Sequence, residues 1–190
     1  MFAKNIHIGC SSFYIAKRKN AFYPENILPA KWFAFYCMHF NSFKINATFY
    51  KFPTLLILTI WYKKSPDGFI HCVKAPKLTK YVKKLVYCKP KIGEFFSFCR
   101  HGMIDKLGSI LFQFPPSFLY NAIKLALIIE AIRLHGILKM FYSKYSRIDL
   151  IKLHDLTDKN LFAKVFIFVN TTASKAGVLN AQELKTLFKS

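Results

Sequence analysis

The chain has 190 residues, 53% of them hydrophobic, a length that suits one sizeable core and predicts a single domain spanning residues 1–190. Lys and Arg outnumber Asp and Glu by 29 to 9, and the net charge of +20 favours attraction to nucleic acid, anionic lipid or phosphorylated ligands. Codon bias in an AT-rich genome would also enrich Phe, Tyr, Ile and Lys together, and we weight that bias above a dedicated polyanion surface.

Short apolar runs alternate with segments of helical spacing, which is the pattern of β-α units and a parallel sheet. In chain order, strands are expected at Asn5–Cys10, Ser42–Ala47, Phe69–Ala75, Gly108–Phe114, Ala131–His135 and Val165–Asn170. Between and after them, helices are expected at Pro29–Phe40, Thr54–Lys64, Ile92–Lys106, Leu119–Glu130, Ser146–Asn160 and Ser174–Lys189. No repeat, low-complexity tract or linker divides the chain, so these elements predict one α/β domain.

Cysteine usage and the apolar runs bear on where the protein works. The five cysteines are widely spaced and include no C-x-x-C pair, which indicates reduced thiols rather than a disulfide framework or a zinc knuckle. No apolar signal region precedes Cys10, and the longest apolar runs are too short or too charged to span a bilayer. We therefore expect a cytoplasmic protein without a membrane span.

Polar residues stand at the late end of every predicted strand. In a closed parallel barrel, alternate side chains point to the axis and ligands meet the carboxyl ends of the strands. By that rule the ligand-binding residues are Ser11, Asn46, Lys74, Gln113, Arg133, His135 and Asn170. Any single one of them is more often a satisfied structural group. The same placement on six strands favours a binding site.

One further cation lies on the second predicted strand. Lys44 and Asn46 share one parity of that strand, so both side chains are predicted to point inward, while Phe43 and Ile45 point to the other face. Lys44 would join two other inward cations at this end of the barrel. Converging cations favour an anionic ligand, because their burial without an anion is costly.

Several blocks of the sequence together resemble the YecE-like family, also called domain of unknown function 72, and the resemblance covers most of the chain. The blocks are Gly9–Ser12, Phe22–Pro24, His39–Pro53, Phe69–Pro76, Leu107–Phe118, Ile132–Gly136, Tyr142–Ser146 and Asn170–Leu184. The resemblance implies a TIM-like β/α barrel. It also implies an enzyme or ligand-binding barrel acting on a phosphate-containing or otherwise anionic small molecule.

The sequence departs from the family's pattern in several ways, of which two bear most on function. The position of Lys44 looks to be a glutamate in the family, so a general acid or base is lost there. Between residues 127 and 132 the family has two further strands, so the barrel is expected to be incomplete, with about six of its eight strands. Open sheet edges invite self-association, and a truncated, non-functional remnant is an open alternative.

The residues leave catalysis open. Acid–base work needs a group that titrates near neutrality, and the inner-face candidates are His135 and His7, of which His135 is the candidate catalytic residue. The chain has no paired carboxylates at strand ends, no H-E-x-x-H motif, no G-x-S-x-G elbow and no Gly-rich phosphate loop. We expect no metal and no cofactor.

A basic segment supports a rival function. Residues 76–91, PKLTKYVKKLVYCKPK, interleave six lysines with Tyr81 and Tyr87, a combination suited to phosphate contacts and base stacking. A solvated loop in a lysine-rich protein explains the same residues, and no recognised nucleic-acid module is present. The sequence thus predicts an anionic small molecule as the partner, with nucleic acid as the alternative and no membrane partner.

Overall fold

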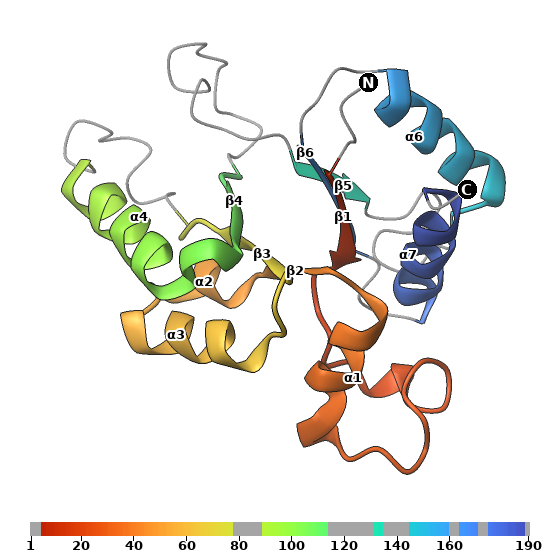
Figure 1. Cartoon of the computed structure of the whole chain (residues 1–190), viewed down its shortest axis with the longest axis horizontal. Helices are drawn as coiled ribbons and strands as arrows, with labels where there is room; N and C mark the ends of the chain where they lie inside the picture. Colours follow the sequence, from red (N-terminus) through yellow and green to blue (C-terminus); the bar gives the residue numbers. More distant parts are fainter. Residues whose placement is uncertain are drawn as a thin grey trace. The chain divides into compact units, whose positions relative to one another are not determined.

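The computed structural model describes residues 5–77, 89–113, 131–134, 145–159, 164–170 and 175–188 (Figure 1). The chain divides into two compact units. The first comprises Met1–Lys44 and Glu130–Ser190, and the second comprises Ile45–Ile129.

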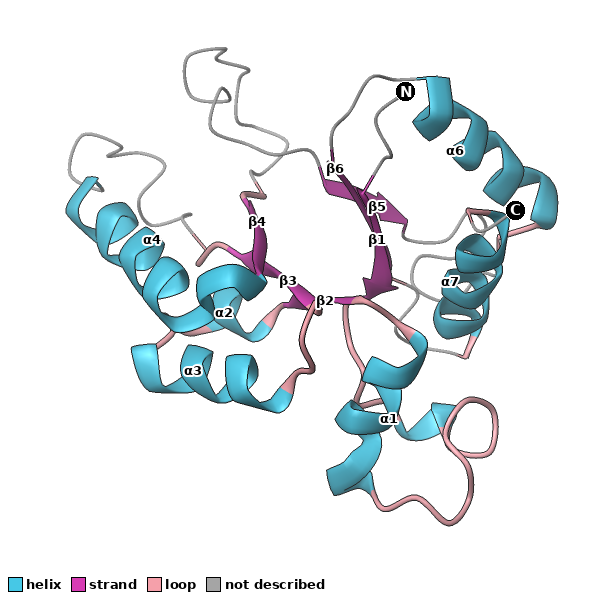
Figure 2. Cartoon of the chain, viewed as in Figure 1, coloured by secondary structure: helices cyan, strands magenta, loops and turns pink. Residues whose placement is uncertain are grey.

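In the first unit, parallel strands alternate with helices (Figure 2). The strands are β1 (Asn5–Cys10), β2 (Ser42–Ile45, whose last residue is the first of the second unit), β5 (Ala131–Leu134) and β6 (Lys164–Val169). The helices are α1 (Trp32–His39), α6 (Arg147–Lys159) and α7 (Ala176–Leu187), with 3-10 turns η1 (Ala16–Arg18) and η2 (Pro29–Lys31). β1 pairs with β2 and with β6, and β6 also pairs with β5, always in parallel.

The core of the first unit forms around β6. Its residues 165–169 read Val-Phe-Ile-Phe-Val and are all buried, as expected for a parallel strand covered on both faces. Val178, Ala181 and Leu184 of α7 are buried as well, at the spacing that places side chains on one face of a helix. α7 contacts both β1 and β6, so its apolar face covers these two strands.

Two side chains complete the seam between β1 and β2. The Asn41 amide accepts a hydrogen bond from the N–H of Ile8 and donates one to a carbonyl two residues earlier in β1, both at 3.1 Å. The Tyr36 hydroxyl accepts from the N–H of Cys10 (2.7 Å) and donates to the carbonyl of Ser42 (2.8 Å). These bonds join the backbone of β1 to the chain at the start of β2.

The second unit pairs β3 (Ile70–Lys74) with β4 (Leu107–Leu111) in parallel. Its helices are α2 (Ala47–Tyr50), α3 (Leu55–Lys64) and α4 (Lys89–Met103), and the 3-10 turn η5 (Ile104–Lys106) leads into β4. α3 begins after Thr54, whose hydroxyl accepts from the N–H of Ile57 (3.3 Å). A Cβ at Gly102 would lie 2.6 Å from that of Leu58, so only glycine permits this approach of α4 to α3.

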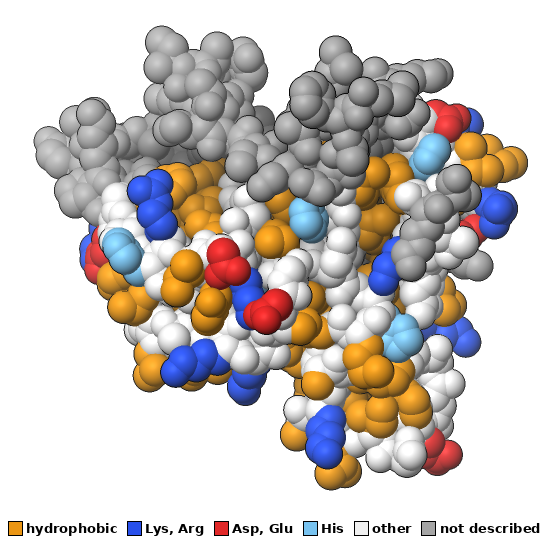
Figure 3. All heavy atoms as spheres, viewed as in Figure 1, with side chains coloured by type: hydrophobic (Ala, Val, Ile, Leu, Met, Phe, Trp, Pro, Cys, Tyr) orange, Lys and Arg blue, Asp and Glu red, His pale blue; other side chains and the backbone are white. Residues whose placement is uncertain are grey.

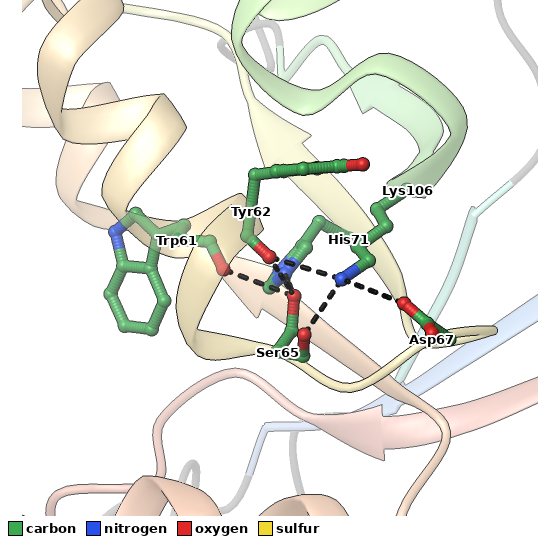
Figure 4. Close-up of polar contacts among 6 residues, drawn as sticks. All are labelled: Trp61, Tyr62, Ser65, Asp67, His71 and Lys106. Atoms are coloured by element: carbon green, nitrogen blue, oxygen red, sulfur yellow. Dashed lines mark hydrogen bonds and ion pairs between the residues drawn. The ribbon is translucent and has the colours of Figure 1, made fainter.

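A buried lysine ties the end of α3 to the start of β4 (Figure 4). The Lys106 ammonium donates to the carbonyls of Ser65 (2.7 Å) and Tyr62 (3.1 Å) and lies 3.8 Å from a carboxylate oxygen of Asp67. Carbonyls at a helix C-terminus lack intrahelical partners, and the helix dipole favours a cation there. Lys106 therefore serves as a structural cap.

The neighbouring histidine of β3 is kept neutral. His71 is buried, and its Nε2 lies 3.1 Å from the hydroxyl oxygen of Ser65. Burial, reinforced by the positive charge of Lys106, lowers the pKa of His71 to about 4. The side chain thus belongs to the packing between α3 and β3, and it is uncharged at neutral pH.

The α/β fold class and the strand order along the chain agree with the sequence. Each predicted strand has a counterpart, and the differences are short: β2 ends at Ile45 and α2 begins where a longer strand was expected, and β4 ends two residues before Gln113. The predicted helix Leu119–Glu130 and the proposed gap before Ile132 lie outside the described residues. Within the described helices, none is both long and apolar enough to cross a membrane.

Candidate functional site

One face of the strands in the first unit carries a column of aromatic and basic groups. His7 lies opposite Phe166 in the β1–β6 register, and the two rings are stacked with centroids 5.0 Å apart. Phe166 in turn is parallel to Phe168, with centroids 6.5 Å apart. The Lys44 ammonium of β2 lies 5.9 Å from the centroid of the Phe168 ring and is completely buried. The positive charge of Lys44 thus lies beside a row of aromatic rings.

The surroundings of Lys44 set its electrostatics. Moving an ammonium group out of water costs several kcal/mol even after relaxation, whereas a desolvated cation–π contact returns about 2 kcal/mol. β1, β2 and β6 contribute no Asp or Glu to this face, since none of the three strands contains one. These three strands therefore bring a positive charge and no carboxylate to this face.

The carboxyl ends of β1 and β6 meet in a buried polar contact. Cys10 and Val169 are neighbours in the register, so the residues that follow them, Ser11 and Asn170, lie side by side. The Ser11 hydroxyl donates a hydrogen bond to the side-chain oxygen of Asn170, and both residues are buried. Two of the predicted ligand-binding residues are therefore in contact at the strand ends.

Three of the other predicted residues belong to the second unit. Lys74 ends β3, is buried, and has its ammonium 3.6 Å from the centroid of the Phe49 ring. Asn46 is half-buried and immediately precedes α2. Gln113 is exposed, beyond the end of β4. Lys74 is thus the last residue of its strand, Asn46 immediately follows β2 as Ser11 follows β1, and Gln113 lies two residues beyond β4.

Of the last two predicted residues, the structure describes the backbone of one and leaves the other outside the described ranges. Arg133 is part of β5, and its backbone stands beside Phe168 in the β5–β6 register. His135, the candidate catalytic residue, lies outside the described residues, as does most of the basic segment 76–91. In the described part of the chain, no three His, Cys, Asp or Glu side chains cluster as metal ligands do.

A buried arginine was missed by sequence reasoning. Arg18 ends η1, in the loop between β1 and α1, and is completely buried. One terminal nitrogen, Nη1, donates to the carbonyl of Ser12 (2.5 Å). Its segment reads Ala-Lys-Arg-Lys-Asn, which is typical of a solvated basic loop. No signal in the sequence separates Arg18 from the exposed lysines on either side.

Two ionisable side chains next to Arg18 are held neutral. Burial raises the pKa of the Cys10 thiol, and the positive charges of Arg18 and Lys44 oppose this shift without reversing it. Burial also raises the pKa of the Tyr36 hydroxyl well above its usual value. At neutral pH these two groups bring no negative charge to the guanidinium.

The comparisons with known proteins concern the family and the fold. A family model described as "Protein of unknown function DUF72" matches residues 7–133. A DUF72 family protein from Thermotoga maritima is similar in structure, with a TM-score of 0.65 and 17% identity over 98% of this chain and 100% of that one. No curated protein matches the sequence.

Two crystal structures of a DUF72 family protein from Enterococcus faecalis are also similar. Their TM-scores are 0.70 and 0.68, each at 12% identity; the first covers 97% of this chain and 96% of that one, and the second covers both chains fully. At these identities the likeness concerns the fold alone, an α/β arrangement of parallel strands.

Proposed function

Because this chain belongs to the DUF72 family of proteins of unknown function, we propose that it binds an anionic, phosphate-containing small molecule at the carboxyl ends of its strands. The proposal includes a TIM-like β/α barrel with about six of the eight usual strands. Ligands of parallel α/β proteins meet this end of the strands, where helix and loop residues can surround them.

The observation that carries the proposal is the burial of Lys44. Its ammonium is completely buried beside Phe168, on a face to which β1, β2 and β6 bring no carboxylate. A phosphate oxygen at this place would form a charge-assisted hydrogen bond in a region of low dielectric, where such bonds are strong. Part of the cost of burying the cation would thereby be offset.

Ser11 and Asn170 are the residues that would orient the bound ligand. They are buried next to each other at the ends of β1 and β6, and a hydroxyl with an amide can both donate to and accept from a ligand. Their mutual hydrogen bond holds both side chains in place before a ligand arrives. Such preorganisation lowers the entropic cost of binding.

The proposal concerns binding and assigns no reaction. The resemblance implies a glutamate where this chain has Lys44, and with the lysine that position supplies no carboxylate for acid–base chemistry. His135 stays the candidate catalytic residue, in the role given to it by the sequence. Arg133, Lys74, Asn46 and Gln113 stay candidate ligand-binding residues on the same basis.

Thermal unfolding tests the proposal. Inorganic phosphate and a nucleoside triphosphate should each raise Tm at matched ionic strength; at a ligand concentration 100 times Kd the stabilisation is about 2.7 kcal/mol, or roughly 5–10 °C. Lys44→Met should lose most of the rise. Lys31→Met, which removes an exposed lysine from the same unit, should keep it. An equal rise in both variants, or no rise in the wild type, would contradict the proposal.

Nucleic acid is the second candidate partner, on the strength of the net charge and of the segment 76–91. On the face drawn in Figure 3, Lys and Arg side chains lie singly among hydrophobic and neutral ones rather than in one patch. Short single- and double-stranded oligonucleotides should bind with affinity that falls steeply as salt rises, if phosphate contacts drive binding. Binding that ignores salt, or its absence at about 50 mM salt, would remove this candidate.

A stable fold is a premise of both candidates. A cooperative thermal transition and one defined mass in solution are expected of a functional protein, and a mass of two chains would support the predicted self-association through open sheet edges. A broad, non-cooperative melt would instead favour the truncated remnant.

A further inference from the structure

The guanidinium of Arg18 has one edge without a hydrogen-bond partner. Arg18 is completely buried, and neither Nε nor Nη2 has a hydrogen-bond partner among the residues that the structure describes. The remaining nitrogen, Nη1, is occupied by the carbonyl of Ser12. Nε and Nη2 project parallel N–H bonds from one edge of the planar group. That edge is the one that binds a carboxylate or phosphate through two hydrogen bonds.

No acidic side chain of the described ranges neutralises this charge. None of the ion pairs found there includes Arg18. The thiol of Cys10 and the hydroxyl of Tyr23 interact with the Arg18 side chain, and burial keeps both in the neutral form by raising the pKa of each. A buried cation is tolerated when it is paired and fully hydrogen-bonded. Among the residues that the structure describes, no anion completes that arrangement for Arg18.

The loop around Arg18 holds the guanidinium in place. The Arg18 carbonyl accepts from the backbone N–H groups of Ala21 (3.2 Å), Phe22 (2.9 Å) and Tyr23 (3.0 Å). The Tyr23 ring is stacked on Trp32 with centroids 4.4 Å apart, and its hydroxyl donates to a carbonyl earlier in the loop (2.6 Å). The arginine is therefore presented by a rigid turn, which is the condition for tight binding of a small anion.

The same turn borders an open pocket. The pocket has a volume of about 430 Å³ and is lined by Asn20, Ala21, Phe22, Tyr23, Pro24 and Glu25. Tyr23 belongs both to this lining and to the surroundings of the guanidinium, since the charge of Arg18 acts on its pKa. The pocket thus lies beside the turn that carries Arg18, whose own side chain is not part of its lining.

We propose that Arg18 is an oxyanion-binding residue, which takes one carboxylate or phosphate group through Nε and Nη2 in the loop between β1 and α1. This site is distinct from the proposed strand-end site, because it uses neither the Ser11–Asn170 pair nor Lys44. It goes beyond the proposed function and does not depend on it. The ligand is a small oxyanion, or one such group of a larger molecule.

Arginine side-chain resonances test this site in the wild-type protein. In protein labelled with ¹⁵N-arginine, the Nε–H of a buried arginine is protected from exchange and gives a resolved signal. Formate and phosphate should each shift one such signal in a saturable way, and chloride at equal ionic strength should not. A shift of this signal with phosphate alone would assign a phosphate site, and a shift with formate alone would assign a carboxylate site. No saturable shift with either anion would overturn the proposal.

Two variants separate this site from the strand-end site. Arg18→Lys keeps the charge and loses the parallel pair of N–H groups, so the shifted signal should vanish together with the part of the Tm rise that formate produces. Lys44→Met should retain the signal and its shift. If Lys44→Met also abolished the shift, the oxyanion would be at the strand ends and the separate site would be refuted. If Arg18→Lys fails to fold, the titration of the wild type and that of Lys44→Met still show whether an oxyanion binds at a site separate from the strand ends.

Discussion

Two buried cations of this protein, one in each unit, differ in how their N–H groups are used. Lys106 of the second unit donates to two carbonyls at the end of α3 and has a carboxylate of Asp67 at 3.8 Å. Arg18 of the first unit donates to one carbonyl and keeps an edge of two nitrogens without hydrogen-bond acceptors among the described residues. Burial of a cation thus does not by itself mark a ligand site. The count of satisfied N–H groups separates a structural cation from a candidate binding group.

The two cations also differ in their place along the strands. Lys106 immediately precedes β4, whereas Arg18 follows β1 and lies in the loop after its carboxyl end. In parallel α/β folds, ligands meet the carboxyl ends, and residues at the opposite ends contribute to stability. The position of each cation therefore agrees with the role that its hydrogen bonds indicate.

The largest effect is expected from Lys106→Met. The substitution removes two charge-assisted hydrogen bonds at the end of α3 and leaves the buried carbonyl of Ser65 without the lysine donor. Each such bond contributes about 1.5–3 kcal/mol, so the free energy of unfolding should fall by about 3–5 kcal/mol. Urea denaturation at pH 7 measures it, with the exposed Lys64 of the same helix as the control in Lys64→Met. If the free energy of unfolding fell by less than about 1 kcal/mol in both variants, Lys106 would not be a structural residue and would not differ from Arg18 in this respect.

Low pH should reduce the free energy of unfolding of the second unit, because His71 is buried in its neutral form. Its pKa is about 4 in the folded protein and about 6.5 when unfolded, so the unfolded state binds more protons below pH 6.5. The stability that the neutral histidine provides is complete above pH 6.5 and is lost as pH falls through 4, by roughly 3 kcal/mol. Urea melts between pH 7.5 and 4 should show this slope, and His71→Gln should flatten it. An unchanged slope in His71→Gln would assign the acid sensitivity elsewhere.

A smaller effect is expected at the seam of the first unit. Tyr36→Phe removes the hydroxyl that bridges the N–H of Cys10 and the carbonyl of Ser42, leaving both buried groups unpaired at a cost of about 1–3 kcal/mol. Chemical denaturation measures the loss. Tyr50→Phe, at an exposed tyrosine, should change the stability by less than about 0.5 kcal/mol. Equal stability of the two variants would mean that water replaces the bridge.

The smallest effect is expected from Arg18→Met in buffer without oxyanions. Removing a buried cation that lacks an anion relieves its desolvation cost while it loses packing and one hydrogen bond, so the net change should be within about 1 kcal/mol. Added formate should widen the difference by stabilising the wild type alone. A loss as large as that of Lys106→Met, without any added anion, would make Arg18 a structural residue like Lys106.

The fold followed from local patterns that are independent of the rest of the chain. β6 was predicted at Val165–Asn170 and runs Lys164–Val169, because an apolar run bounded by polar residues has few alternatives to a buried strand. α4 was predicted to continue to Lys106, but its last three residues form the turn η5. Lys106, the last residue of this turn, donates to the carbonyl of Ser65 after α3, a contact between residues that are far apart in sequence.

The candidate site was predicted only in part. The position after each strand placed Ser11 and Asn170 at the same edge, and the parallel register of β1 and β6 brings them into contact. The alternation of side chains along a strand could not predict where Asn46 and Gln113 point, because their strands end earlier than expected. Arg18 was missed entirely, since a basic residue between two lysines has the pattern of a solvated loop.

The sequence by itself determined the alternation of strands and helices and the family, because periodicity and motif order are properties of neighbouring residues. Only the tertiary structure decided which charged groups are buried and which N–H groups find acceptors. Lys106 is paired through contacts that span 41 and 44 residues, and Arg18 is completely buried although both of its neighbours in sequence are exposed. Burial and hydrogen-bond satisfaction depend on groups brought together from distant segments, so no local pattern encodes them.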